Sequence, residues 1–362
     1  MSTLEIKKQL LTYPGDTIEE TIEALGMSKA ELAERLGRTP KFINDLLKGE
    51  ASITQELAIK LEYVLGVPAK GWLALERKYQ DDLLEIKKEE FKQTCYDWIK
   101  KFPLPHLKKN GIIPKTTDKN ILVDSLLSFF RVATPEEWSK IYNEESLAFK
   151  IELRHATQPE AISTWLRMGE LDVKDIHLSS FDKKVLKNCI PSIQELSYNM
   201  PSDWTVQLKQ ICASFGVALS LCQIMPKAPI YGAARWIQSK TIPLIQVTDR
   251  RKNINSFWFS FYHELGHIYL HGKKEIFLEG IEEIECNQEK EDEADNFARK
   301  LLMPNSLRKE LETYFNLSVP DVIHLSKKYR VNPGIIVEQA KRLKIVAYSN
   351  PQFRSLMTKI EF

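Results

Sequence analysis

The run His263-Glu-Leu-Gly-His267 constrains this chain more than any other feature of its sequence. Residues four apart on an α-helix lie about 40° apart around its axis, so the two histidines share a face and can reach one Zn²⁺ ion. The preceding aromatic segment, 257–262, indicates a buried helix, which we predict from Ser256 to His271. Glu264 flanks the open side of this metal site and is the predicted general base.

A catalytic zinc ion needs a third protein ligand and an open fourth position. The extended histidine pattern of the metzincins is absent, because Leu270 stands where that pattern requires glycine. We expect the ligand from the acidic start of a following helix, where Glu291 and Asp295 lie four residues apart. One of these can bind the metal while the other accepts a hydrogen bond from a ligand histidine. Glu293 is the alternative ligand, and the helix dipole alone explains some of these charges.

A His-Glu-x-x-His zinc site is typical of zinc peptidases. In these enzymes a His, Tyr or Arg side chain that faces the metal stabilises the oxyanion formed in the reaction. Tyr231, Arg235 and His271 are the candidates. Two of them have a plain structural explanation as well. Tyr231 can simply pack beside a strand, and His271 can cap the end of the active-site helix.

Several motifs together resemble the ImmA/IrrE family of metallo-endopeptidases, over roughly residues 200 to 345. They are Ile230-Tyr-Gly-Ala-Ala-Arg-Trp236, the segment from Trp258 to His271, Glu291-x-Glu-Ala-Asp-x-Phe-Ala298 and Leu301-Leu-Met-Pro304. The resemblance implies a zincin-like fold in which His263, His267 and, by motif position, Glu291 hold zinc. It implies that Glu264 is the general base. It also implies a protein substrate, such as a repressor or antitoxin, that is cut at one or a few sites.

The first 70 or so residues consist of short helix patterns joined by tight turns. Ser28 with Glu31 forms a capping box, and Gly37 ends the helix that it opens. Thr39 with Pro40 then opens another helix, so the spacing predicts a helix-turn-helix. Asparagine can pair with adenine, and lysine can meet phosphate or guanine. The predicted DNA-contact surface consists of Arg38, Thr39, Lys41, Asn44, Asp45 and Lys48.

Residues 10 to 80 resemble the HigA-like antidote branch of the Xre repressor family. The resemblance is carried by this helix pair, by Tyr13-Pro-Gly-Asp16 and by Val67-Pro-Ala-Lys-Gly-Trp-Leu73. It implies operator binding by a homodimer that reads two half-sites. Arg38 departs from the family, which usually has an apolar residue there. Residues 1–80 contain 11 Lys and Arg against 12 Asp and Glu, so a strong basic footprint is missing and a protein-binding role is the alternative.

The fold class predicted for the whole chain is mainly α with a small α+β domain. We predict a helix-turn-helix domain at 1–75, a helical connecting region at 76–200 and a zincin-like domain at 201–362. Trp98, Trp138 and Trp165 are the expected core anchors of the connecting region. Short strands are predicted in the last domain, at 217–222, 230–236 and 242–247.

Composition removes several other classes of function. The net charge is only +2, and the five cysteines are scattered and never spaced C-x-x-C, which argues against a disulfide framework and a cysteine zinc cluster. No apolar run approaches the roughly 18 residues of a membrane helix, so we expect a cytoplasmic protein. The leading hypothesis is a DNA-binding regulator with a zinc endopeptidase domain. The alternatives are an antitoxin-like transcription factor whose peptidase body is an inactive sensor or scaffold, and a peptidase whose helix-turn-helix only docks substrates of that fold.

Overall fold

A computed structural model describes residues 3–144, 158–228, 230–237, 241–250, 252–271, 277–279, 288–360 and 362. It divides the chain into two compact units, which are residues 1–97 with 116–124, and residues 98–115 with 125–362. None of the helices in these described ranges is long and apolar enough to cross a membrane.

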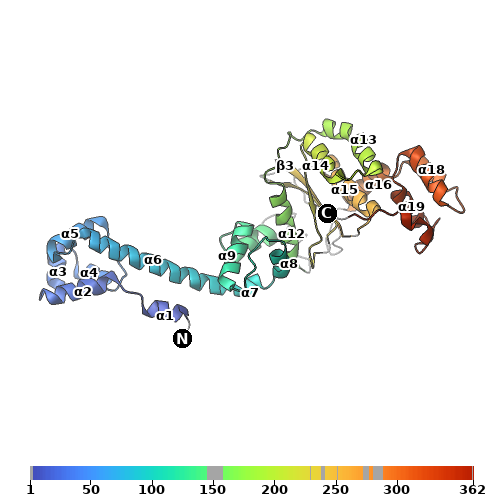
Figure 1. Ribbon diagram of the computed structural model, residues 1–362. Coiled ribbons are helices and arrows are strands. Elements are labelled where there is room, and N and C mark those ends of the chain that lie inside the picture. Colours follow the sequence, from blue (N-terminus) through green and yellow to red (C-terminus); the bar gives the residue numbers. More distant parts are fainter. Residues whose placement is uncertain are drawn as a thin grey trace. The chain divides into compact units, whose positions relative to one another are not determined.

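The first unit is helical (Figure 1). The hydroxyl oxygens of Ser28, Thr39 and Thr54 accept hydrogen bonds from backbone amides in the first turns of α3, α4 and α5, as N-caps do. Gly37 ends α3 in the left-handed conformation, with φ of 63°. Its helices are α1 (Thr3–Gln9), α2 (Pro14–Ala24), α3 (Lys29–Leu36), α4 (Pro40–Leu47), α5 (Gln55–Leu65) and α6 (Ala69–Thr94).

The helix-turn-helix pair is α3 and α4, and the two helices share one apolar core. Leu32, Leu36, Ile43 and Leu46 are all buried in one cluster with residues of α2 and α5. The small Ala33 is buried there too. The predicted helix-turn-helix is therefore confirmed in its helices, its turn and its packing.

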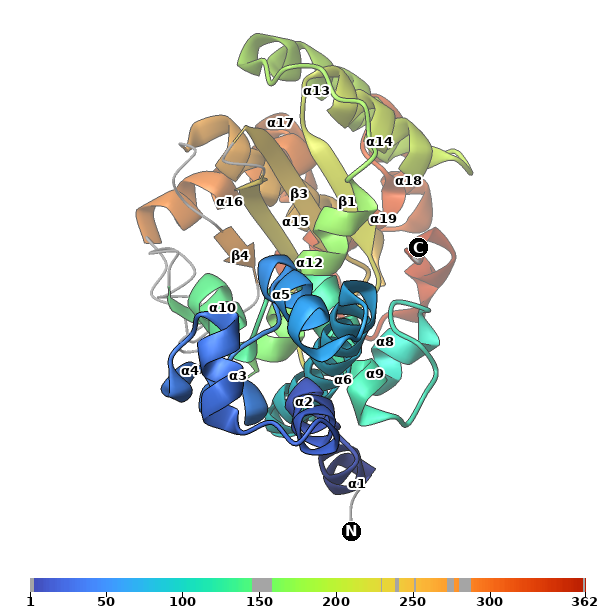
Figure 2. The ribbon, with the colours of Figure 1, turned by 90° about the vertical axis from the view of Figure 1, so that its left-hand side faces the viewer.

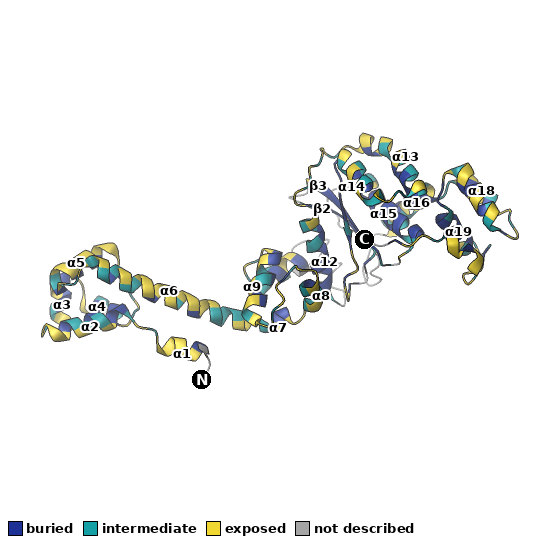
Figure 3. Ribbon diagram, in the orientation of Figure 1, coloured by how far each residue is buried: buried dark blue, intermediate teal, exposed yellow. Residues whose placement is uncertain are grey.

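Helix α6 is 26 residues long and runs through the expected domain boundary at residue 75. Its first turn contributes the fully buried Trp72 to the core of the helix-turn-helix. Much of its later length is exposed (Figure 3). Ion pairs join α1 to its C-terminal part, and they link Lys7 with Glu89 at 2.8 Å and Lys8 with Glu90 at 2.5 Å.

An aromatic cluster lies near the start of the second unit. The rings of Trp98, Phe102, Phe130, Trp138 and Tyr142 contact one another, mostly edge to face. The elements around this cluster are α7 (Tyr96–Ile99), α8 (Leu104–Lys109), α9 (Lys119–Phe130), α10 (Pro135–Ser139) and a π-helix, η1 (Lys140–Glu144). The three tryptophans predicted as core anchors are all buried.

A four-stranded sheet forms the centre of the second unit, in the order β1-β3-β2-β4. Strand β1 (Ala218–Cys222) is parallel to β3 (Ile242–Thr248). Strand β2 (Gly232–Ile237) is antiparallel to β3 and to β4 (Phe277–Glu279). The predicted fold class, mainly α with a small α+β domain, is confirmed.

Helix α15 (Ile254–Leu270) packs against β2 and β3 in the main core. Ala234, Ile245 and Val247 supply the apolar surface of the sheet in that core. The other helices of this unit are α12 (Pro159–Asp172), α13 (Lys183–Asn199), α14 (Trp204–Ser214), α16 (Gln288–Leu302), α17 (Asn305–Leu311), α18 (Val319–Tyr329), α19 (Pro333–Arg342) and the 3₁₀ turn η2 (Pro351–Leu356).

Helix α12 packs against β1 and β3 (Figure 2), and polar side chains of β2 and β3 bond to its backbone. The amide of Gln246 donates to the carbonyl oxygen of Trp165 at 2.7 Å, and Arg235 donates to that of Leu166 at 2.6 Å. Gly169 permits this contact, because a Cβ there would lie 2.1 Å from the Gln246 side-chain oxygen. Part of the predicted connecting region therefore shares a core with the sheet.

Candidate metal centre and DNA-contact surface

Helix α15 carries the His-Glu-x-x-His run into the interior. Asn253 caps its first turn by accepting a hydrogen bond from the Ser256 amide at 2.8 Å. His263, Glu264 and His267 are only 3%, 0% and 1% exposed. Polar side chains at such depth are costly to bury unless they have partners, so their contacts decide what the helix can do.

The two histidines meet a carboxylate of α16. Their Nε2 atoms lie 2.9 Å apart, and Glu291 places one carboxylate oxygen 3.1 Å from Nε2 of His263 and the other 3.4 Å from Nε2 of His267. One potential ligand atom from each residue falls within 4.8 Å of the others. Two imidazoles and one carboxylate are a donor set typical of catalytic zinc.

Protonation in this cluster also fits a metal site. Burial lowers the pKa of His267 to about 4, against the opposing effect of its hydrogen bond with Glu291. Burial raises the pKa of Glu291, but hydrogen bonds with His263 and His267 outweigh this effect and lower it to about 2. A neutral imidazole and an ionised carboxylate are the forms that bind metals.

The outer ring nitrogens of both histidines have partners as well. Nδ1 of His263 lies 3.0 Å from a carboxylate oxygen of Asp295, which also accepts a hydrogen bond from Arg299. Nδ1 of His267 lies 3.1 Å from Nδ1 of His271. The far nitrogen of His271 contacts the exposed Glu293 at 3.0 Å. Glu291 rather than Glu293 therefore faces the histidine pair, and Asp295 occupies the supporting position expected of it.

Glu264 is held against strand β2. A Cβ atom on Gly232 would lie 2.5 Å from a carboxylate oxygen of Glu264 and 2.9 Å from its Cγ atom. Only glycine leaves this space, so β2 fixes where the carboxylate can lie. A similar close approach joins α15 to α16, because a Cβ on Gly266 would lie 3.2 Å from the Cα atom of Ala294. The sequence analysis did not single out either glycine.

The three residues predicted to stabilise an oxyanion have contacts of their own. His271 contacts the side of the His267 ring that is opposite the histidine pair. Arg235 points to α12. Tyr231 directly precedes β2, and the guanidinium of Arg250 covers its ring at 4.9 Å. A role of these three residues in stabilising an oxyanion stays a prediction.

The side chains of the predicted DNA-contact surface are not all exposed and without other contacts. Thr39, Lys41, Asn44 and Lys48 are exposed on α4, whereas Asp45 is half-buried. Thr39 already accepts the capping hydrogen bond from Phe42 at 3.2 Å. Arg38 lies over the Phe42 ring at 5.2 Å and pairs with Glu56 at 3.6 Å, so its packing accounts for the departure from an apolar residue.

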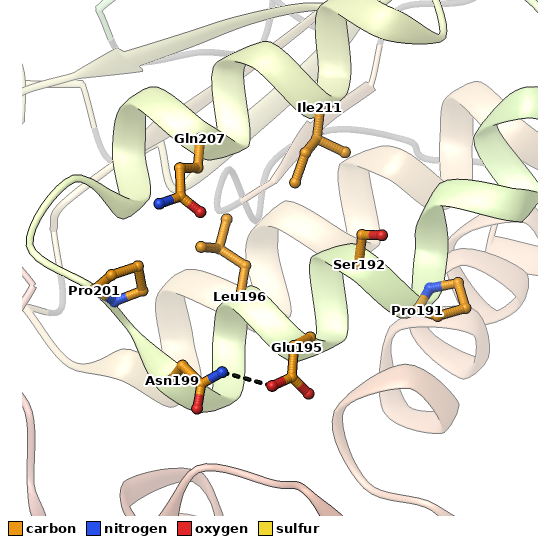
Figure 4. A pocket seen from close by; sticks show the side chains of 8 residues that line it. All are labelled: Pro191, Ser192, Glu195, Leu196, Asn199, Pro201, Gln207 and Ile211. Carbon is orange, nitrogen blue, oxygen red and sulfur yellow. Dashed lines mark hydrogen bonds between the residues drawn. The ribbon is translucent and has the colours of Figure 1, made fainter.

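An open cavity lies between α13 and α14 (Figure 4). Its volume is about 430 Å³, and no predicted site residue lines it. The lining residues are Pro191, Ser192, Glu195, Leu196, Asn199, Pro201, Gln207 and Ile211.

Comparison with known proteins matches both ends of the chain. A helix-turn-helix family model matches residues 18–72, and a peptidase family model described as the IrrE N-terminal-like domain matches residues 223–341. The chain is 38% identical over 66 residues to an uncharacterized HTH-type transcriptional regulator, YddM of Escherichia coli (strain K12), which is 18% of this chain and 70% of that protein. It is 30% identical over 78 residues to virulence-associated protein I of Dichelobacter nodosus, which is 21% of this chain and 72% of that protein. The chain therefore belongs to the helix-turn-helix regulators and carries, fused to that domain, an IrrE-like peptidase domain.

Proposed function

We propose that this chain is a DNA-binding transcriptional regulator whose IrrE-like domain is a zinc-dependent endopeptidase. The observation that carries this proposal is the convergence of His263, His267 and Glu291 beside the buried Glu264. The two imidazoles and the carboxylate come from two helices that pack closely at Gly266. A cluster of this kind has no simpler use in a core, where apolar side chains would pack at less cost.

Zinc is the metal that this donor set fits, and His263, His267 and Glu291 would hold it. When bound, zinc supplies a Lewis acid that polarises a peptide carbonyl and acidifies a water molecule. Asp295 and His271 would keep the two rings in the required orientation. Glu264 would take a proton from the attacking water and pass it to the leaving amine.

The substrate we propose is a repressor or antitoxin protein, cut at one or a few sites. A helix-turn-helix on the same chain supports this proposal, because it connects proteolysis to transcription. We assign operator contacts to Lys41, Asn44 and Lys48, which are exposed on α4. Binding as a homodimer to two half-sites is part of the proposal.

Metal content and cleavage test the peptidase. The purified full chain should contain about one zinc ion, and replacing His263 and His267 with alanine should remove it. The proteins encoded by genes next to this one are the substrates to test by co-expression and immunoblotting. Wild type should cleave one of them, whereas Glu264→Gln should bind zinc and cleave none. Equal cleavage by wild type and Glu264→Gln would reject the proposed base.

The second candidate function is an antitoxin-like transcription factor whose peptidase body is a scaffold or sensor. A third candidate uses the helix-turn-helix only to dock protein substrates. The nearly balanced charge of residues 1–80 and the pairing of Arg38 with Glu56 favour it over DNA binding. A gel-shift with the chain's own promoter separates these candidates. A scaffold binds the promoter and cleaves none of the neighbouring gene products even as the wild type, whereas a docking module does not bind the promoter.

A further inference from the structure

His271 directly follows α15, and each of its two ring nitrogens contacts another side chain. It caps the C-terminus of the helix, and its side chain is only 4% exposed. Nδ1 lies 3.1 Å from Nδ1 of His267, and Nε2 lies 3.0 Å from a carboxylate oxygen of Glu293. For an imidazole buried between another imidazole and a carboxylate, the hydrogen bonds decide which ring nitrogen carries the proton.

The nitrogen of His267 that faces the ligand cluster determines which nitrogens of His267 and His271 carry protons. Its Nε2 points to His263 and Glu291, so a metal bound there requires the proton of His267 on Nδ1. Nδ1 of His267 then donates to Nδ1 of His271, which must be unprotonated. His271 therefore carries its proton on Nε2 and donates it to Glu293. Each donor meets an acceptor in this arrangement.

The opposite arrangement, in which His271 donates the hydrogen bond to His267, conflicts with metal binding. If His271 donated to His267, the proton of neutral His267 would lie on Nε2, directed at the position the metal needs. The contact with Glu293 favours the first arrangement, because a carboxylate accepts hydrogen bonds and does not donate them. His263 achieves the same result with one partner fewer, since Asp295 accepts from its Nδ1 directly.

We propose that His271 and Glu293 form a hydrogen-bonded relay that fixes the tautomer and orientation of His267 for metal binding. Both are positioning residues, and Glu293 acts through His271. The proposal rests on the proposed zinc site. Losing such a partner of a ligand histidine typically weakens metal binding by about 10- to 100-fold, so His271→Ala should fall in this range. His271→Gln retains a side-chain oxygen that can accept the proton of His267, and it should lose less.

Zinc affinity of the full chain, measured by competition with a chromophoric chelator, tests the relay. Glu293→Gln should weaken binding by several fold to about 10-fold, because the amide oxygen is a poorer acceptor than a carboxylate. The double variant His271→Ala, Glu293→Gln should bind zinc as His271→Ala does, because Glu293 has no path to His267 without the imidazole. The visible spectrum of the cobalt-substituted protein should shift in His271→Ala and return toward wild type in His271→Gln.

The control is Glu289→Gln, which removes an exposed carboxylate from the same helix and should leave zinc affinity unchanged. An additive double variant would overturn the relay, since Glu293 would then act as a charge alone. Unchanged affinity in His271→Ala would overturn it as well. If the wild type itself binds no zinc, the proposed function fails. If the wild type binds zinc and His271→Ala binds it equally well, only the relay fails.

Discussion

Gly232 of β2 should control catalysis without controlling metal binding. In Gly232→Ala the new Cβ atom would lie 2.5 Å from a carboxylate oxygen of Glu264, and ordinary contacts begin at 3.4 Å. The carboxylate must therefore move by about 0.9 Å, and a misplacement near 1 Å can cost about 100-fold in rate. His263, His267 and Glu291 are not among the atoms nearest to this Cβ, so zinc should still bind.

The same clash sets the cost in stability. Glu264 is completely buried, so its side chain must move within packed surroundings, and overpacking of this kind costs roughly 1–3 kcal/mol. The double variant Gly232→Ala, Glu264→Asp shortens the carboxylate by one methylene and should regain stability while remaining inactive. Zinc content, chelator competition, thermal unfolding and cleavage of the identified substrate measure these outcomes together.

A wild-type rate of cleavage in Gly232→Ala would refute this reasoning, because the base would then tolerate displacement or have room to avoid it. Loss of zinc in this variant would refute it in another way, since the effect would then reach the ligands. Reduced cleavage with normal zinc binding and no rescue of stability by Glu264→Asp would locate the clash at an atom other than the Glu264 side chain.

Three further changes have definite expectations. Gly266→Val should push α16 from α15, lower the free energy of unfolding by roughly 1–3 kcal/mol in thermal unfolding and weaken zinc binding, because Ala294 lies against this position. Gly37→Val should cost about 1–2 kcal/mol, because the left-handed φ of 63° strains a β-branched residue, and Gly37→Asn should cost less in the same assay. Lys41→Ala should weaken promoter binding in a salt-dependent gel-shift and reduce the slope against log salt by about one, whereas an unchanged slope would remove Lys41 from the phosphate contacts.

Local chemistry made the helix-turn-helix predictable from sequence. Ser28 and Thr39 cap helices that begin at the next residue, and Gly37 takes the left-handed turn that ends α3. Each of these signals acts within a few residues, so the sequence alone expresses it. The histidine pair of the candidate metal site was predictable for the same reason, since the four-residue spacing of His263 and His267 defines one helix face.

The long-range packing was not predictable in this way. Arg235 was predicted as a candidate side chain facing the metal. It is buried instead and donates a hydrogen bond to the carbonyl oxygen of Leu166, 69 positions earlier in the sequence. Gln246 is equally buried against Trp165. Nothing near either residue signals these partners, because they depend on α12 docking on the sheet. Which face a strand residue such as Arg235 takes follows from strand pairing, which joins segments far apart in the sequence.

Helix α16 holds the proposed ligand Glu291 together with Asp295 and Glu293, the outermost side chains proposed to support the two histidines. Glu291 meets the ligand pair, Asp295 meets His263, and Glu293 meets His271, so displacing α16 would remove all three at once. Zinc binding should therefore stabilise the docking of α16 on α15, in proportion to how far zinc exceeds its dissociation constant. Hydrogen exchange of the full chain should show slower exchange of α16 amides with zinc than after chelation, and no change in α3. Equal exchange in both states would mean that α16 is fixed by its apolar packing alone, with the ligands held ready before any metal arrives.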